Sequence, residues 1–154
     1  MSMKSWLYRG GRPNRVARIL DRFTAALFGL GIGSGYLLVL EVTGRRSGRT
    51  FGLPLVVADV EGERYLVSML GERANWVRNV RAAGGNASIR HGRREEVRLE
   101  EIAAGSRAPV LKAYLKRAPG ARAHVPVHKD APLAEFERVA PRFPVFRLVW
   151  REVT

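Results

Sequence analysis

The chain of 154 residues contains no cysteine. Disulfides, thiolate nucleophiles, cysteine-ligated zinc and iron–sulfur clusters are therefore excluded. Histidine is scarce as well, with only His91, His124 and His128. His124 and His128 are four residues apart, but Pro126 lies between them and works against a helical pair of metal ligands. The sequence therefore predicts no metal site.

Acidic residues are also few, with 14 Asp and Glu against 27 Lys and Arg, which gives a formal net charge of +13. Such an excess favours association with nucleic acid, an anionic membrane surface or a polyanionic small molecule, and charge alone does not choose among them. The hydrophobic fraction of 46% is ordinary for a folded protein. The length predicts that residues 1–154 form a single domain.

A continuous apolar run long enough to span a membrane is missing. Residues 23–40 are uncharged, but Gly29, Gly31, Gly33 and Gly35 interrupt them, and each glycine costs a helix about 1 kcal/mol. We expect a helix, a glycine-rich turn and a buried strand here. No small-residue cleavage site of the secretory kind is present, so we expect a cytoplasmic location.

The N-terminal region is expected to have two parts. Residues 1–13 read as an irregular, flexible arm. From Asn14, apolar residues recur every three or four positions opposite basic ones, which predicts an amphipathic helix. This helix either covers a sheet or brings its basic face to anionic lipid, a peripheral membrane contact.

Six strands are expected in the rest of the chain. The Glu61-Gly62 pair predicts a tight hairpin turn, and Pro54 marks an edge or a bulge. The expected strands are Tyr36–Val42, Phe51–Val60, Arg64–Leu70, Asn86–His91, Glu95–Ile102 and Phe143–Arg151. Mostly antiparallel strands with helices outside them predict the α+β class and a small six-stranded barrel.

The helices and loops carry more specific expectations. Asn75 is expected to cap a short helix that ends at Gly84-Gly85, and Ser106 to open another that ends near Ala118. Residues 121–132 read as a loop that folds over a site, and residues 133–139 as a short helix. In the last strand, Phe146, Leu148 and Trp150 are expected to share one face.

The stretch from Glu41 to Leu55 carries the strongest functional signal. It reads as a strand, a tight turn rich in arginine, and a second strand. Gly44 and Gly48 allow positive φ and close approach of a ligand, while Ser47 offers a hydroxyl beside three arginines. The stretch predicts an anion site, and the alternative is a hairpin turn that merely displays solvated charge.

The sequence shows no conventional catalytic constellation. No Ser-His-Asp set, paired carboxylates or histidine cluster has a recognisable spacing. The carboxylates at positions 95, 96, 100 and 101 read as a solvated strand surface. If the protein is an enzyme, a cofactor must supply the chemistry.

The order of motifs resembles the deazaflavin-dependent nitroreductase family. The segment Thr43-Gly-Arg-Arg-Ser-Gly48 is followed by Pro54-Leu55, then by Ser68 at a strand end, then by Asn75-Trp76 with Asn79. The similarity runs from about residue 36 to residue 102 and includes the terminal strand. Members of this family are split β-barrels that bind coenzyme F-420, a deazaflavin with a phosphate and an oligoglutamate tail.

The resemblance implies which residues bind the cofactor. A phosphate site is implied at Arg45, Arg46, Ser47 and Gly48, contacts to the acidic tail at Arg49 and Arg78, and a ring site near Pro54, Leu55, Ser68, Met69 and Trp76. Trp76 reads equally as a core aromatic. Asn75 and Asn79 are implied at the site, or else only cap and brace their helix.

The chain also departs from the family. Relatives often carry a basic residue where this chain has Phe51, and another after the serine of the third strand, where it has Met69 and Leu70. Phosphate contacts from these positions are therefore not carried over from the family. Tyrosines that shape the substrate side in some members have no clear counterpart, although Tyr114 is a candidate. The catalytic proton comes from Tyr114, from a histidine of the loop at residues 121–132 or from solvent, and the sequence does not choose among them.

The implied function is an oxidoreductase that transfers a hydride from reduced F-420 to a flat, electron-poor small molecule such as a quinone, an enone or a nitro compound. Two alternatives remain. One is an FMN-binding split barrel, and the other is a non-enzymatic basic binder of anionic lipid or nucleic acid. Nucleic acid is the weaker partner because the aromatic residues sit at core-like positions. The oligomeric state is expected to be a monomer or a homodimer.

Overall fold

The computed structural model describes residues 8–9, 12–13 and 36–151. Near the N-terminus, β1 (Tyr8–Arg9) pairs antiparallel with β2 (Arg12–Pro13), so the expected irregular arm contains a short paired piece. The helix predicted from Asn14 lies outside the described residues.

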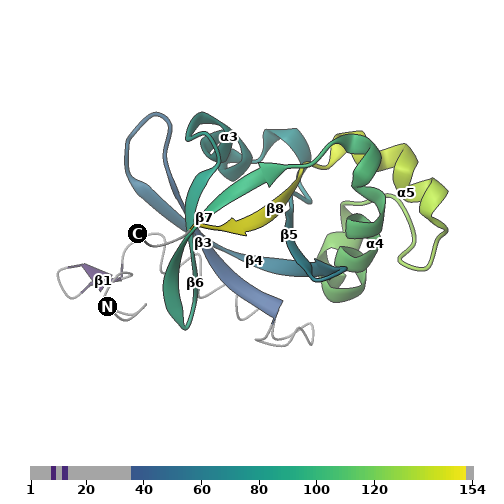
Figure 1. Cartoon of the computed structure of the whole chain (residues 1–154), viewed down its shortest axis with the longest axis horizontal. Helices are drawn as coiled ribbons and strands as arrows, with labels where there is room; N and C mark the ends of the chain where they lie inside the picture. Colours follow the sequence, from purple (N-terminus) through teal and green to yellow (C-terminus); the bar gives the residue numbers. More distant parts are fainter. Residues whose placement is uncertain (1–7, 10–11, 14–35, 152–154) are drawn as a thin grey trace.

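A closed barrel of six strands forms the body of the protein (Figure 1). Its strands are β3 (Leu37–Thr43), β4 (Thr50–Val60), β5 (Glu63–Val67), β6 (Asn86–His91), β7 (Arg93–Glu101) and β8 (Val145–Trp150). The order around the barrel is β3-β4-β5-β8-β7-β6, and every neighbouring pair is antiparallel. The prediction of a six-stranded α+β barrel is confirmed.

Local sequence explains the long β3–β4–β5 meander. Glu61 and Gly62 have φ of 51° and 80°, the two positive values that a two-residue primed turn requires. Pro54 pairs with Val39 on β3, while β4 pairs with β5 only from Val57 onward. Pro54 therefore lies in a part of β4 that has a neighbouring strand on one side only, an edge segment as predicted. Proline, which has no backbone N–H, is tolerated at such a position.

The barrel interior holds one of two apolar clusters. Leu40, Leu66 and Val97 are 0% exposed there. Helix α3 (Asn75–Ala82) adds Trp76 and Val80 to the same cluster. This helix lies across one end of the barrel (Figure 1).

Helix α3 differs from its prediction at its start. The cap position is Ala74, which has no side chain for capping, and Asn75 is already the first helical residue. The prediction that Asn75 caps the helix is wrong. The end of the helix is as expected, because Gly84 and Gly85 both have positive φ and the Gly85 amide donates to the Val80 carbonyl at 2.9 Å.

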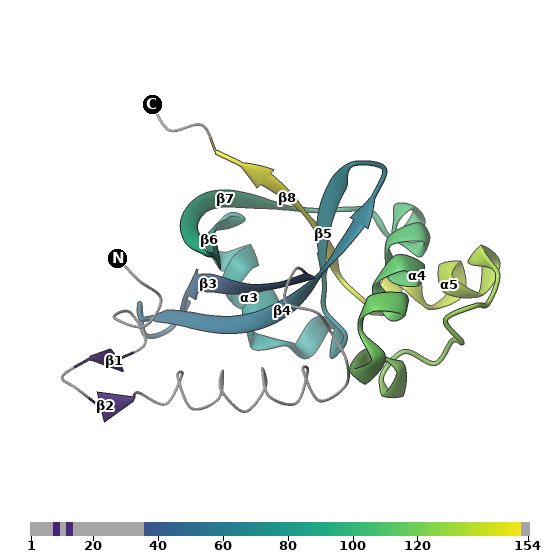
Figure 2. The ribbon, with the colours of Figure 1, turned by 90° about the horizontal axis from the view of Figure 1, so that it is seen from below.

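A second apolar cluster lies outside the barrel, where α4 (Ala108–Arg117) packs beside β4 and β5 and α5 (Leu133–Val139) packs on α4 (Figure 2). The short 3-10 helices Gly71–Arg73, Ala104–Ser106, Pro119–Ala123 and Ala140–Arg142 connect the larger elements.

The loop at residues 121–132 belongs to this outer cluster. Ala121, Val125 and Ala131 are buried in it against α4. None of its residues lines the cavity described below, and that the loop folds over a site stays a prediction.

Two further features complete the fold. Phe146, Leu148 and Trp150 lie two apart along the unbroken ladder of β8 and therefore share one face, as expected. Phe146 and Leu148 are buried, whereas Trp150, the last residue of the strand, is 41% exposed. Among the described residues, no helix has both the length and the apolar character needed to cross a membrane.

Candidate functional site

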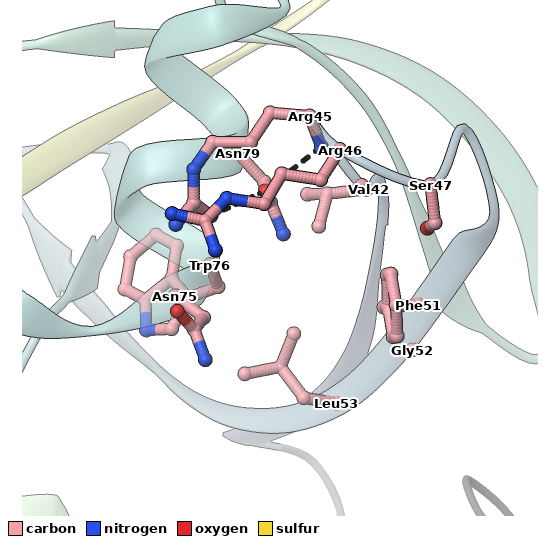
Figure 3. Close-up of a pocket in the computed structure, with 11 residues that line it drawn as sticks. Val42, Arg45, Arg46, Ser47, Phe51, Gly52, Leu53, Asn75, Trp76 and Asn79 are labelled. Atoms are coloured by element: carbon pink, nitrogen blue, oxygen red, sulfur yellow. Dashed lines mark hydrogen bonds between the residues drawn. The ribbon is translucent and has the colours of Figure 1, made fainter.

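A cavity of about 500 Å³ lies between the outer end of the β3–β4 hairpin and helix α3 (Figure 3). This volume falls within the usual range of small-molecule sites. The hairpin contributes Val42, Gly44, Arg45, Arg46, Ser47, Phe51, Gly52 and Leu53, and α3 contributes Asn75, Trp76 and Asn79.

The register of the hairpin explains its apolar wall. Val42 lies directly opposite Phe51, and Leu40 opposite Leu53. Directly opposed residues share a face of the sheet, and so do residues two apart on one strand. The barrel-facing side of the hairpin therefore continues past the barrel core and becomes the wall of the cavity.

The turn of this hairpin, residues 44–49, forms the polar side of the cavity and is called the arginine turn below. The Gly44 amide donates to the Arg49 carbonyl at 2.7 Å, and the Gly48 amide donates to the Gly44 carbonyl at 3.0 Å. Gly48 has φ of 70°, where glycine is the favoured residue. The Ser47 hydroxyl oxygen accepts from the Arg49 amide at 3.2 Å.

Asn79 links α3 to the arginine turn. Its Oδ1 accepts from the Arg45 backbone amide at 3.1 Å and from the Arg45 Nη1 at 2.8 Å. Asn75 is one helical turn earlier and faces the same cavity (Figure 3), as positions four apart on a helix must. Arg78 lies between them in sequence and does not line the cavity.

Trp76 serves the core and the site together. It is 8% exposed and lies 5.5 Å from Phe146, centroid to centroid, inside the barrel cluster. It also lines the cavity, on the side opposite Phe51 (Figure 3). The interpretation of Trp76 as a core aromatic is confirmed. Its contact with a cofactor ring stays a prediction, which its place in the cavity lining supports.

The cavity is cationic and carries no compensating acid. Among its lining residues, Arg45 and Arg46 are charged, and none is an aspartate, glutamate, histidine or tyrosine. Within the described part of the chain, no salt bridge involves either arginine. No group of three or more possible metal ligands occurs in that part either. The chemistry offered is anion binding beside an apolar wall.

The structure gathers about half of the residues that the sequence singled out. Of these, Arg45, Arg46, Ser47, Asn75, Trp76 and Asn79 line the cavity. The others lie outside its lining: Gly48, Arg49, Pro54, Leu55, Ser68, Met69, Arg78 and Tyr114. Gly48 and Arg49 still belong to the arginine turn, at its edge.

The ring-site residues are spread over several surroundings. Pro54 and Leu55 are neighbours on a strand, so their side chains point to opposite faces. Leu55 packs on the barrel cluster, whereas Met69 packs on the outer cluster. Ser68 is 1% exposed, and its hydroxyl donates to the Gly71 carbonyl at 2.7 Å.

Tyr114 is buried in the outer cluster beside α5, with 5% of its surface exposed. Burial raises the pKa of its phenol above the ordinary value. The structure therefore does not bring the proposed proton donor to the cavity.

Sequence reasoning missed Val42, Gly52 and Leu53 in the lining. The signal for Val42 and Leu53 was the alternation of strand residues: once Phe51 faces the ligand, Leu53 and the directly opposed Val42 must share that face. Gly52 lies on the other face and had no such signal. The sequence analysis noted Phe51 only as a position where relatives often carry a basic residue. The structure places its ring in the apolar wall of the cavity.

Fold and site together define a small antiparallel β-barrel with a cationic turn beside an apolar wall. A family model described as F420H(2)-dependent quinone reductase matches residues 15–125. The chain belongs to this family. It is therefore an F-420-dependent reductase, as predicted, and the family decides for coenzyme F-420 over FMN. None of the curated proteins matches the chain.

Several solved structures resemble the chain. A structure described as an F420-H2 dependent reductase, FDR-A, is 22% identical, with 74% of this chain and 94% of that chain covered and a TM-score of 0.49. A protein described as a domain-swapped dimer is 18% identical, with coverage of 84% and 96% and a TM-score of 0.53. A conserved hypothetical protein of Mycobacterium tuberculosis is 14% identical, with coverage of 84% and 80% and a TM-score of 0.56. The last two support the barrel fold.

The residues present fit the cofactor. A phosphate and a glutamate tail require cations free of acidic partners, and Arg45 and Arg46 meet that requirement. A flat conjugated ring requires an apolar wall, which Phe51, Leu53 and Trp76 provide.

Proposed function

We propose that the protein uses reduced F-420 to reduce a quinone, and that the cavity between the hairpin and α3 holds the cofactor with its phosphate at the arginine turn and its ring against the apolar wall. One observation carries the proposal: two arginines without acidic partners stand beside an apolar wall. When bound, reduced F-420 supplies a hydride from C5 of its deazaflavin ring. Arg45 and Arg46 bind the phosphate, and the apolar wall excludes water.

The cavity lining contains no side chain that could act as a general acid, and this supports a quinone as the acceptor. Hydride addition to a quinone gives a hydroquinone monoanion, which is stable enough to take its proton from water. An enone would instead give an enolate that calls for a positioned acid. No residue of the described cavity lining carries a carboxyl, imidazole or phenol group. The nearby guanidinium charges favour the anionic product.

The contribution of each residue follows from its position. Arg46 offers a guanidinium with no partner in the described structure, whereas Arg45 shares one donor with Asn79. Asn75 presents an amide to the cavity and orients the bound ligand. Arg49, at the end of the arginine turn, and Arg78, on α3, are both exposed, and we assign them to the acidic tail. The structure offers Tyr114 no such role, so solvent is the proposed proton source.

Binding of F-420 tests the proposal most directly. Purified protein is titrated with oxidised F-420 while the fluorescence of the cofactor is followed. Saturation in the micromolar range is expected, with a dissociation constant that rises steeply with salt because the contacts are ionic. No saturation at micromolar cofactor would reject the proposal.

The acceptor is tested separately. Loss of F-420H2 absorbance is followed with menadione, with a cyclic enone and with a nitroaromatic compound at equal concentrations. We expect the largest kcat/KM for the quinone. A larger value for the enone would overturn the argument from the missing acid.

A binding module for nucleic acid or anionic lipid remains the alternative function. Affinity for DNA or for anionic vesicles, together with indifference to F-420, would favour it. Contact of residues 1–28 with a membrane stays a prediction, because residues 14–28 lie outside the described structure. Location in the cytoplasm and the choice between monomer and homodimer also stay predictions, although one structural neighbour is described as a domain-swapped dimer.

A further inference from the structure

The arginine turn is contacted from two sides by side chains that carry no charge. Asn79 reaches it from α3, and Phe51 reaches it from β4 (Figure 3). Neither contact adds to the positive charge of the cavity. Their effect must be on the shape and rigidity of the turn.

Asn79 fixes one arginine at two places. The same Oδ1 atom accepts from the backbone amide and from the guanidinium of Arg45, at 3.1 and 2.8 Å. Asn79 is itself 7% exposed and sits on a helix packed into the barrel. A rigid, buried acceptor thus holds the backbone of the turn and turns the Arg45 side chain toward α3, leaving the other guanidinium donors for a ligand.

Phe51 supports the turn from the opposite side. A Cβ atom on Gly44 would lie 2.5 Å from Cε2 and 3.2 Å from Cδ2 of the Phe51 ring. The ring therefore rests directly against the Gly44 backbone, where only glycine leaves room. The ring remains 41% exposed. At this position, where relatives often carry a basic residue, the Phe51 ring supports the turn by packing against it and adds no charge.

The internal hydrogen bonds of the arginine turn do not position the turn relative to the rest of the molecule. The bonds from Gly44 to Arg49 and from Gly48 to Gly44 close the backbone loop. They do not fix the loop relative to α3 or to the wall. The outward contacts of Asn79 and Phe51 provide that constraint.

We propose that Asn79 and Phe51 are positioning residues that preorganise the arginine turn for its anion. The identity of that anion as the phosphate of F-420 rests on the proposed function above. Ordering a long arginine before the ligand arrives removes part of the entropy cost of binding. Loss of either support therefore weakens binding without removing any cation.

The first experiment measures F-420 affinity by fluorescence. Asn79→Leu is expected to weaken binding about tenfold, the order expected for one lost charge-assisted hydrogen bond. In an Arg45→Ala background, Asn79→Leu should cause almost no further loss, because it acts through Arg45. The matched control is Asn86→Leu, since Asn86 Oδ1 also accepts from an arginine, the Nη1 of Arg151 at 3.2 Å, away from the cavity. Its affinity should equal that of wild type.

The second experiment needs no ligand. Amide hydrogen exchange, followed by NMR, should show a protected Arg45 amide in the wild type and faster exchange in Asn79→Leu. Asn79→Asp keeps the acceptor oxygen, so protection should persist while the added negative charge weakens F-420 binding. A merely structural asparagine would not separate these two readouts.

The third experiment tests Phe51. Phe51→Ala should weaken F-420 binding several-fold although no charge is lost, and Gly44→Ala should do the same by displacing the ring. Phe51→Lys should bind no tighter than wild type, because the added charge does not replace the support. Leu133→Ala serves as the control, since Leu133 is 44% exposed on α5 and remote from the cavity.

The outcomes separate the two proposals. Absence of F-420 binding by the wild type would reject the proposed function, and the exchange of the Arg45 amide would still test the role of Asn79. Binding by the wild type that is unchanged in Asn79→Leu and Phe51→Ala would overturn the preorganisation. So would additive losses from Asn79→Leu and Arg45→Ala.

Discussion

Arginines behave differently in two regions of the molecule. Arg107, 7% exposed, donates to the Ile102, Ala140 and Phe143 carbonyls at 2.9, 3.1 and 3.3 Å, and to the Glu101 carboxylate at 3.2 Å. Arg45 and Arg46 line a cavity that holds no carboxylate.

The positions of the glutamate side chains explain why the two groups of arginines differ. Glu101 also accepts from Arg81, whose second partner is Glu72 at 2.6 Å. Glu100 pairs with Arg147, and Glu96 with Arg151. Four carboxylates of this basic chain lie on β7, and three of them, Glu96, Glu100 and Glu101, neutralise structural arginines. The charge left over at the arginine turn is available to a ligand.

Replacing Arg107 should have the largest effect and fall on the fold alone. Arg107→Leu leaves three carbonyls and one carboxylate without their donor, which costs about 3–5 kcal/mol of unfolding free energy. Urea unfolding measures the loss. If the leucine variant does not fold, Arg107→Lys is expected to recover part of the stability. F-420 affinity of the folded fraction should match wild type, and a large loss of affinity would show that the two regions are coupled.

Replacing Arg45 and Arg46 should produce the reverse pattern. The double alanine variant is expected to weaken F-420 binding about 100-fold or more, because each charge-assisted contact contributes about 1.5–3 kcal/mol. Unfolding free energy should stay within about 0.5 kcal/mol of wild type, as for surface substitutions. Fluorescence titration and urea unfolding of the same preparation provide both values. Unchanged affinity would place the phosphate elsewhere.

Acid should weaken the carboxylate region before it affects the arginine turn. The hydrogen bond from Arg81 lowers the pKa of Glu72 below its ordinary value of 4.5. Because the folded-state pKa is lowered, the ionised carboxylate contributes its full stabilisation at pH values above the ordinary pKa of 4.5. This stabilisation is lost as the pH falls through the lowered pKa.

Glu72→Gln measures this contribution. At pH 7 the variant should lose less than about 1 kcal/mol, because the pair is largely exposed. The difference from wild type should shrink as the pH is lowered below 4.5. A difference that grows with acid would contradict the assigned direction.

The fold was accessible from the sequence because its signals are local. Paired positive-φ residues at Glu61-Gly62 and the terminating glycines of α3 set the turns, and α5 was predicted at the residues it occupies. Longer-range facts were not accessible. Whether residues 121–132 cover a site or fill the groove beside α4 depends on packing that no local pattern encodes.

The site was predicted in part for the same reason. The arginine turn is contiguous, so its members were found together. The ring site was drawn from residues distant in sequence, and Ser68, Met69 and Leu55 turned out to pack in different surroundings. The hydrogen bonds of Asn79 to Arg45 span 34 positions and have no sequence signature.

Replacing Tyr114 should have the smallest effect. Tyr114→Phe removes the only phenol that the sequence offered as a proton donor, yet the side chain lies in the outer cluster and not in the cavity lining. We expect kcat with a quinone to change less than about twofold, a change too small for the loss of a general acid, which contributes about 10²–10⁴-fold. The pH dependence of kcat should also stay the same. A drop of 100-fold would mean that the outer cluster takes part in the reaction, and the contrast between a packing region and a binding region would fail at this residue.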